Sequence, residues 1–269
     1  MNWICPHCRE PLVKVERSYH CETGHCFDQA KEGYVNLLPA NRKRSRDPGD
    51  NREMVEARKR VHAADVYRTL AEAVAAYFKE LSHASVLDLG CGEGYYGGVV
   101  LEHAPKISMW GIDIAKPAVR LAAKAHPRGR FAVASAYEVP LGDSSMDAIF
   151  SVFAPVGESE PARLLSHEGF FLNICPAARH LWQLREHLYA DPKPHKEVAA
   201  ALPGLALEKQ EKIGFSVALE PPLLADLVAM TPYAYGGQRE SKATLEQLGV
   251  FEVQMEFLLQ CYRREQATA

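Results

Sequence analysis

The sequence predicts an α/β protein in which a small zinc-binding segment precedes a mostly parallel sheet. Two observations support this fold class. From Ser85 onward, short apolar runs alternate with stretches of helical spacing, a pattern typical of βαβ units. Four of the seven cysteines fall within the first 26 residues, which is a metal-site pattern. The 269 residues suffice for one full α/β domain and a small appendage.

Composition narrows the class of protein further. Hydrophobic residues make up 47% and charged residues 24% of the chain, as in ordinary globular proteins. The net charge of −3 excludes a surface coated in positive charge but allows a local basic patch. No apolar run approaches the roughly 18 residues of a membrane span, and the N-terminus lacks signal-peptide features. We therefore expect a cytoplasmic protein with no membrane partner.

The N-terminal cysteines predict a structural zinc site. Cys5-Pro-His-Cys8 is a C-x-x-C pair, and Cys21-Glu-Thr-Gly-His25-Cys26 follows after twelve intervening residues. In a reducing compartment this spacing indicates metal ligation rather than disulfides. Three thiolates and one imidazole would close a tetrahedral Zn²⁺ site, with His25 favoured as fourth ligand and Cys26 as its competitor. A segment this short would draw most of its folding free energy from the metal.

A polar, basic stretch links the zinc segment to the rest of the chain. Residues 42–60 hold eight basic and four acidic side chains, which form either a solvated face or a contact for phosphates. Helices are expected at Arg52–Ala63 and at residues 66–81 from their apolar spacing. We divide the chain into a zinc-binding segment (1–38), a basic linker with a helix (39–65) and a catalytic domain (66–269).

Seven strands are expected in the catalytic domain. Five carry the alternating βα pattern, and two follow a helical stretch near the C-terminal end, at residues 225–230. The expected strands are Ser85–Leu89 and residues 109–114, 130–134, 146–153, 169–175, 213–219 and 250–262.

A glycine-rich turn at the end of the first of these strands predicts a nucleotide-like cofactor. Asp88 precedes Gly90, Gly92 and Gly94, so the spacing is G-x-G-x-G rather than the pyrophosphate-binding G-x-G-x-x-G. A carboxylate at Asp88 would repel a pyrophosphate but could hold a cationic amino-acid group. Asp113 ends the next strand, where it could accept hydrogen bonds from ribose hydroxyls or cap a helix. The pattern favours S-adenosylmethionine over NAD.

These motifs together resemble a known family. Leu87-Asp-Leu-Gly-Cys-Gly-Glu-Gly-Tyr-Tyr96 resembles motif I of class I S-adenosylmethionine-dependent methyltransferases. With the cysteine segment, Ala30-Lys-Glu-Gly-Tyr-Val-Asn-Leu-Leu-Pro39 and Lys43-Arg-Ser-Arg-Asp-Pro-Gly-Asp50, the chain resembles the 23S ribosomal RNA guanine-N1 methyltransferases. The resemblance implies a Rossmann-like class I fold with a seven-stranded sheet. It also implies zinc ligation by Cys5, Cys8, Cys21 and His25.

The resemblance assigns further site residues. It implies cofactor contacts at Tyr67, Tyr95, Tyr96 and His180, joining Asp88, Gly90, Gly92 and Asp113. From the residues alone, Tyr67 and His180 read equally as packed core residues, and Tyr96 as packing the first helix against the sheet. The target base would lodge against Phe153, Ala154 and Pro155, where relatives often carry a tyrosine in place of the phenylalanine. No residue stands out as the general base.

The expected function is methyl transfer from S-adenosylmethionine to N1 of a guanine in the hairpin 35 loop of 23S rRNA. The resemblance implies that one branch of the family confers macrolide resistance and that a homodimer is possible. Two alternatives remain open at this point: a methyltransferase acting on another RNA or a small molecule, and a non-catalytic zinc-ribbon protein that binds RNA during ribosome assembly. An NAD-linked dehydrogenase is the weakest reading, because of the glycine spacing.

Overall fold

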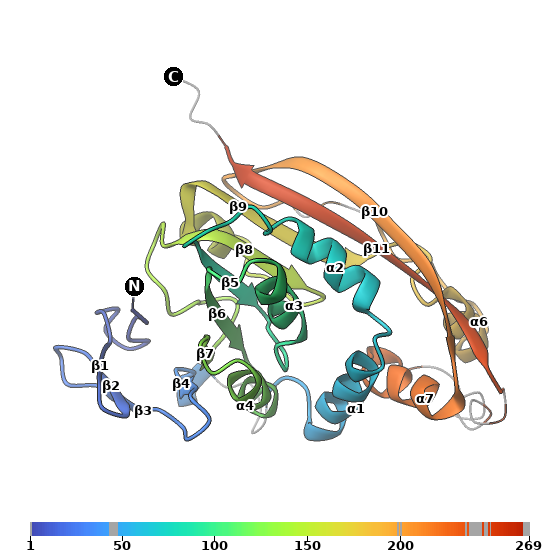
Figure 1. Ribbon diagram of the computed structural model, residues 1–269, viewed down its shortest axis with the longest axis horizontal. Coiled ribbons are helices and arrows are strands. Elements are labelled where there is room, and N and C mark those ends of the chain that lie inside the picture. The colour runs from blue at the N-terminus through green and yellow to red at the C-terminus, as the bar shows by residue number, and fades with distance from the viewer. Residues whose placement is uncertain are drawn as a thin grey trace.

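The computed structural model describes residues 2–42, 48–197, 199, 201–234, 236, 244, 247 and 249–265. Within these residues, a sheet of eight strands in the order β10-β11-β9-β8-β5-β6-β7-β4 forms the centre of the molecule (Figure 1). Strands β9 to β4 pair in parallel, whereas β11 runs antiparallel to both β9 and β10. The strands are β4 (Val35–Asn36), β5 (Ser85–Leu89), β6 (Ser108–Asp113), β7 (Arg130–Val133), β8 (Met146–Val152), β9 (Leu165–Pro176), β10 (Leu205–Leu219) and β11 (Phe251–Arg264).

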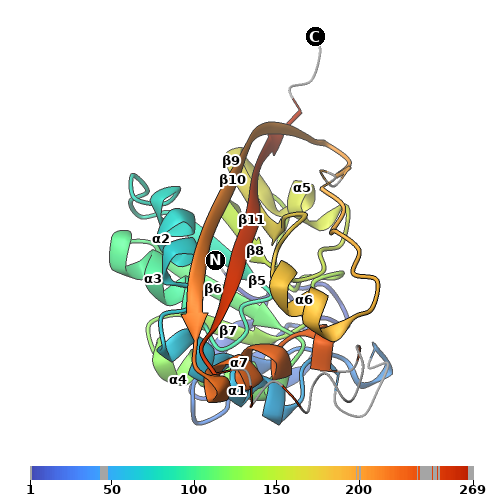
Figure 2. The ribbon, with the colours of Figure 1, turned by 90° about the vertical axis from the view of Figure 1, so that its right-hand side faces the viewer.

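Helices cover one face of this sheet and part of the other. Figure 2 shows α2 and α3 on one side and α5 on the opposite side. Asn51 caps α1, because its side chain accepts a hydrogen bond from the Met54 amide at 2.9 Å. The helices are α1 (Arg52–Ala63), α2 (Arg68–Ala76), α3 (Tyr95–His103), α4 (Lys116–Ala125), α5 (Glu160–Leu164), α6 (Trp182–Leu188) and α7 (Pro221–Ala229), with 3₁₀ turns at Ala40–Arg42 and Pro232–Ala234.

The zinc-binding segment covers the sheet where no helix does. A small antiparallel sheet of β1 (Val13–Val15), β2 (Ser18–His20) and β3 (Cys26–Asp28) lies beside β4 (Figure 1). The connection from β7 to β8 contains no helix among its residues, all of which the structure describes. Trp3 packs edge-on against Trp110 of β6, with ring centroids 4.8 Å apart. The segment thus shares a core with the sheet.

The seven expected strands are all present, with some different limits. Strand β10 begins at Leu205 rather than near residue 213, because its first half carries exposed polar side chains at the edge of the sheet and lacks an apolar run. Helix α2 ends at Ala76, short of residue 81, in tight turns such as the 2.9 Å hydrogen bond from the Phe78 amide to the Ala75 carbonyl. Strand β4 was not expected, because two residues leave no periodic pattern.

Candidate functional site

Four side chains of the zinc-binding segment converge on one point. One ligand atom each from Cys5, Cys8, Cys21 and His25 lies within 4.8 Å of the others. The Sγ atoms of Cys8 and Cys21 are 3.6 Å apart, and Sγ of Cys21 lies 3.3 Å from Nδ1 of His25. Tetrahedral zinc with Zn–S of about 2.3 Å and Zn–N of about 2.0 Å requires similar ligand separations, of roughly 3.5 to 3.8 Å. The donor set therefore fits Zn²⁺.

The fourth ligand is His25, not Cys26. The Cys26 side chain is exposed, and its Sγ lies 3.7 Å from Nε2 of His20, outside the cluster. The hydroxyl of Thr23 lies 3.0 Å from Sγ of Cys8 and 3.0 Å from Sγ of Cys21. It lowers the pKa of the Cys8 thiol, which favours the thiolate that binds metal.

The glycine loop between β5 and α3 has the backbone that a close-approaching ligand requires. Gly90, Gly92 and Gly94 have φ of 85°, 53° and 88°, a region that favours glycine. A Cβ atom at Gly90 would lie 2.3 Å from Cβ of Ala154, so the loop after β8 packs directly on the glycine loop. The predicted cofactor turn and the predicted base pocket are therefore neighbours.

Two buried carboxylates flank this loop. Asp88, at 3% exposure, sits on β5, and burial together with Asp113 and Glu93 raises its pKa well above the usual range. Asp113 ends β6 and accepts hydrogen bonds from the amides of Gly92 at 3.0 Å and Ala115 at 2.7 Å. Asp113 thus holds the glycine loop and the turn before α4, and each oxygen retains a second acceptor site. It is not the helix cap that the alternative anticipated, because Ala115 is the N-cap residue of α4 and that helix has no side-chain cap hydrogen bond.

Helix α1 lies over the glycine loop and supplies two side chains that pair with acids beside it. The Arg58 guanidinium pairs with Asp50 and lies 3.7 Å from the position that a Cβ would take at Gly92. His62 pairs with Glu93, inside the loop. Burial raises the pKa of Glu93, but its interactions with His62, a backbone hydrogen bond and the nearby Arg58 together lower that pKa below its usual value. From the sequence, Arg58 was counted only within the basic stretch 42–60 and His62 was not identified, because nothing in their spacing brings α1 to the loop.

The side chains of Tyr95 and Tyr96, which follow the loop, lie in different surroundings. The Tyr95 ring stacks on His62 at 4.1 Å and lines a cavity of about 590 Å³ between α1, α3 and α4, together with Lys59 and Lys124. Burial raises the pKa of the Tyr96 hydroxyl well above its usual range, with Tyr67 as a close neighbour. Tyr96 therefore lies with the other predicted cofactor residues, whereas Tyr95 faces the separate cavity.

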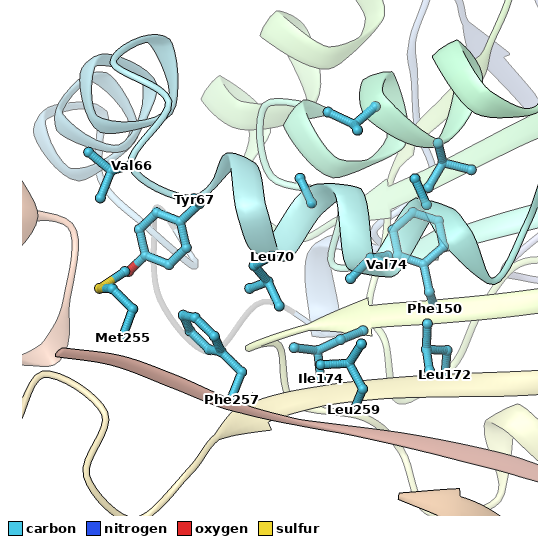
Figure 3. Close-up of a cluster of buried hydrophobic side chains, with 14 of the residues drawn as sticks. Val66, Tyr67, Leu70, Val74, Phe150, Leu172, Ile174, Met255, Phe257 and Leu259 are labelled. Atoms are coloured by element: carbon cyan, nitrogen blue, oxygen red, sulfur yellow. The ribbon is translucent and has the colours of Figure 1, made fainter. Parts of the chain in front are cut away.

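Aromatic rings gather where β8 ends. Phe153 adopts a positive φ of 56° and is 39% exposed. Its ring centroid lies 6.2 Å from Tyr67, 6.1 Å from His180 and 5.5 Å from Phe257. Figure 3 shows Tyr67 at the start of α2, directed at Met255 and Phe257 of β11. Three predicted site residues from three distant parts of the chain thus meet around one exposed ring.

Some of the basic side chains of residues 42–60 form ion pairs within the protein. Arg58 pairs with Asp50, and Arg60 pairs with Asp226 of α7 at 2.6 Å. Arg52 and Lys59 are exposed. Residues 43–47, which hold three of the predicted phosphate-binding side chains, lie outside the described residues.

Comparisons with known proteins agree with both parts of the site. Residues 3–46 match the N-terminal zinc ribbon model of RlmA, and residues 86–167 match a methyltransferase domain. A 23S rRNA (guanine(748)-N(1))-methyltransferase of Streptomyces fradiae is 35% identical over 240 residues, covering 86% of this chain and 85% of that protein. The chain belongs to the family of 23S rRNA (guanine-N1)-methyltransferases. A relative from Micromonospora griseorubida, 33% identical over 74% of each chain, has a name of the same class.

Solved structures share the fold of this family member. The YcgJ protein of Bacillus subtilis superposes with a TM-score of 0.51, at 18% identity, over 74% of this chain and all of that one. A methyltransferase of Haloferax volcanii, solved with its Trm112 activator, has a TM-score of 0.51 at 20% identity, over 80% and 96% of the two chains. The protein is an S-adenosylmethionine-dependent enzyme of class I fold with a zinc ribbon. Within the described residues, no helix is long and apolar enough to span a bilayer.

Proposed function

We propose that this family member transfers the methyl group of S-adenosylmethionine to N1 of a guanine in the hairpin 35 loop of 23S rRNA, in the cytoplasm. The names of its relatives support guanine N1 of 23S rRNA as the target. One observation carries the proposal: the half-exposed Phe153 ring sits beside Tyr67 and His180, and the next residue, Ala154, packs on the glycine loop. A guanine unstacked from its loop would find an aromatic platform there.

The cofactor contacts belong to the same proposal. Asp88 would hold the cationic amino group of the cofactor, directly or through water, and Asp113 would accept hydrogen bonds from the ribose. When bound, S-adenosylmethionine supplies a sulfonium methyl group that is already strongly electrophilic. The protein's part is then mainly alignment of base and methyl in line. The proposed contact residues are Tyr67, Asp88, Gly90, Gly92, Tyr96, Asp113 and His180. The predicted contact at Tyr95 is not included, because that ring stacks on His62 and lines the separate cavity.

His180 has a defined protonation state in this pocket. Burial lowers its pKa to about 3, so the ring is neutral near pH 7. Its Nδ1 accepts a hydrogen bond from the Glu256 amide at 3.4 Å, and the proton therefore resides on Nε2. In this tautomer Nε2 can only donate. We therefore propose that His180 orients an acceptor atom of the base or cofactor and does not remove the N1 proton.

The RNA would be held by backbone contacts and loop shape. The exposed Arg52 and Lys59 of α1, the rest of residues 42–60 and the zinc ribbon are the proposed phosphate contacts. A homodimer, which the family resemblance implies, would extend this grip over two subunits. Sedimentation of the purified protein with and without a hairpin 35 transcript tests that arrangement.

Transfer of tritium from labelled S-adenosylmethionine to two transcripts tests the proposed function. One transcript carries the natural hairpin 35 loop, and in the other the loop guanines are replaced by adenine. We expect label on the first alone. Phe153→Ala should raise KM for the RNA with little change in cofactor affinity. Phe153→Tyr, which keeps an aromatic ring, should have a KM for the RNA close to that of the wild type. Equal labelling of both transcripts, or no labelling of either by a cofactor-bound enzyme, overturns the proposal.

A further inference from the structure

Helix α6 begins beside the aromatic rings at the end of β8. His180 lies two residues before Trp182, the first residue of α6, and its ring centroid is 6.1 Å from that of Phe153. Leu181 turns the chain into the helix with a positive φ of 55°, and its amide donates to the Gln254 carbonyl of β11 at 2.8 Å. Figure 2 shows α6 beside β11. The helix is therefore fixed next to the proposed base platform.

Two arginines contact the indole ring of Trp182. The guanidinium carbon of Arg179 lies 4.8 Å from the ring centroid, and that of Arg185 lies 5.7 Å from it. Such cation–π contacts stabilise a guanidinium that has lost part of its hydration. Arg179 is exposed, whereas Arg185 is half-buried and its Nη1 atom is buried. The tryptophan therefore helps to fix the orientation of a cation with one nitrogen inside the protein.

The buried Nη1 atom of Arg185 lacks an acceptor. Within the part of the chain that the structure describes, this atom has no hydrogen-bond partner and the guanidinium has no ion pair with a carboxylate. Two acids near α6 are engaged elsewhere: Glu197 accepts a hydrogen bond from the Ala178 amide at 2.7 Å, and Glu197 and Glu256 pair with Lys212 at 3.2 and 3.1 Å. A buried cationic donor without an acceptor lowers stability, which indicates a site for an anion that binds from outside.

The imidazoles near Arg185 are neutral near pH 7. Burial, His195 and Arg185 all lower the pKa of His180, and burial and Arg185 lower the pKa of His195. The two imidazole centroids lie 6.4 Å apart, and the Tyr233 hydroxyl lies 3.3 Å from Nε2 of His195. Neutral hydrogen-bonding groups therefore surround one permanent positive charge. This arrangement suits a phosphate, which a guanidinium binds through two parallel N–H···O bonds.

We propose that Arg185, held by Trp182, binds the phosphate on the 5′ side of the target guanosine and so fixes the nucleotide whose base stacks on Phe153. The inference rests on the proposed function, because it requires an RNA whose guanine has left its loop. His180 joins the two ends of this site, since its ring lies beside Phe153 and within the field of Arg185. Phosphate contacts position a nucleic acid on a protein. Arg185 is thus a positioning residue that aligns the base with the cofactor and moves no proton.

A double-mutant cycle between the guanidinium and the phosphate tests the contact. Arg185→Gln, and a hairpin 35 transcript with a neutral methylphosphonate 5′ of the methylated guanine, should each lower kcat/KM about tenfold or more, as loss of a charge-assisted hydrogen bond does. The two changes together should cost no more than either alone, whereas losses that add overturn the contact. Arg185→Lys, which keeps the charge, should retain part of the activity. Arg128→Gln, an exposed arginine before the amino end of β7, is the matched control and should behave as wild type.

Cofactor affinity distinguishes the RNA phosphate from the other anionic group available, the carboxylate of S-adenosylmethionine. In the absence of RNA, Arg185→Gln should bind S-adenosylhomocysteine as tightly as the wild type does by calorimetry, which also shows that the variant is folded. A loss of affinity in Arg185→Gln that Arg185→Lys restores would assign the guanidinium to the cofactor and overturn the inference. A wild-type enzyme that labels no hairpin 35 transcript overturns the proposed function and this inference with it. Wild-type labelling that Arg185→Gln leaves unchanged overturns the inference alone.

Discussion

Asp88 is a buried acid whose raised pKa makes cofactor binding depend on pH. A carboxyl with a pKa raised by folding stabilises the folded state at low pH and loses that contribution as pH rises through the folded value. A cationic amino group beside Asp88 would lower that pKa and expel the proton. Titrations of S-adenosylhomocysteine in buffers of different ionisation enthalpy should therefore reveal proton release on binding.

The matched variant for this measurement is Asp88→Asn, which keeps the shape and removes the titration. It should bind S-adenosylhomocysteine at least tenfold more weakly and show no proton release attributable to residue 88. Wild-type affinity in this variant would contradict the role of Asp88. Asp113, also with a pKa raised by burial, is the other acid beside the loop, so comparison of the two asparagine variants separates their contributions.

At Gly90, the addition of a single methyl group should destabilise the folded protein. Alanine there combines a φ of 85° with a Cβ only 2.3 Å from Ala154. Left-handed strain alone costs about 1–3 kcal/mol. We expect Gly90→Ala to lower Tm by about 5 °C or more. Gly142→Ala, where nothing lies within 4 Å of the added methyl, should melt as wild type does. Equal melting of the two variants would exclude the packing described for Gly90.

At the scale of elements, the zinc ribbon and the sheet should unfold together. Trp3, at 2% exposure, packs on Trp110 of β6, so Trp3→Ala should cost about 3–5 kcal/mol. Urea unfolding of this variant, monitored both by zinc release and by circular dichroism, should show one transition. Its midpoint should be lower than that of the wild type, by the same amount in both signals. Trp3→Phe should shift it less. A zinc signal that moves alone would mean that the ribbon is an independent unit.

Elements with strong periodic patterns could be predicted from the sequence, and those set by tertiary pairing could not. The strand Ser85–Leu89 and the helix Arg52–Ala63 have the expected limits. The glycine turn directly after Leu89 marks the end of the strand, and an asparagine cap marks the start of the helix. Strand β4 exists only because β7 offers a free edge, and no local signal marks it. The first half of β10 is likewise held by its partner β11 rather than by its own apolar content.

The candidate site divides in the same way. Zinc ligands, glycines and strand-end acids could be predicted, because each chemistry requires those residue types at fixed spacing. The placement of α1 over the glycine loop could not, since Arg58 and His62 meet Asp50 and Glu93 only through the fold. The different surroundings of the Tyr95 and Tyr96 rings also could not be predicted, because the Tyr95 ring stacks on His62, which is far from both in sequence.

At the scale of the whole molecule, RNA binding must rely on a local patch, because the net charge is −3. The observed affinity for a hairpin 35 transcript should fall as salt rises, in proportion to the phosphates contacted. Replacing both Arg52 and Lys59 by alanine should reduce the slope of log K against log salt by about 2. Lys106→Ala, an exposed lysine in the loop before β6 and outside the proposed patch, is the control. An unchanged slope in the double variant would place the RNA on another face.

The central claim is methylation of guanine N1 within hairpin 35, and mapping of the modified nucleotide tests it most directly. Ribosomal RNA from cells that lack this gene would be incubated with the enzyme and labelled S-adenosylmethionine, then read by reverse transcription. A methyl group at N1 blocks Watson–Crick pairing, so we predict a new stop at a guanine of the hairpin 35 loop that requires both enzyme and cofactor. Label on the RNA with a stop elsewhere, or with no stop at all, would contradict the account.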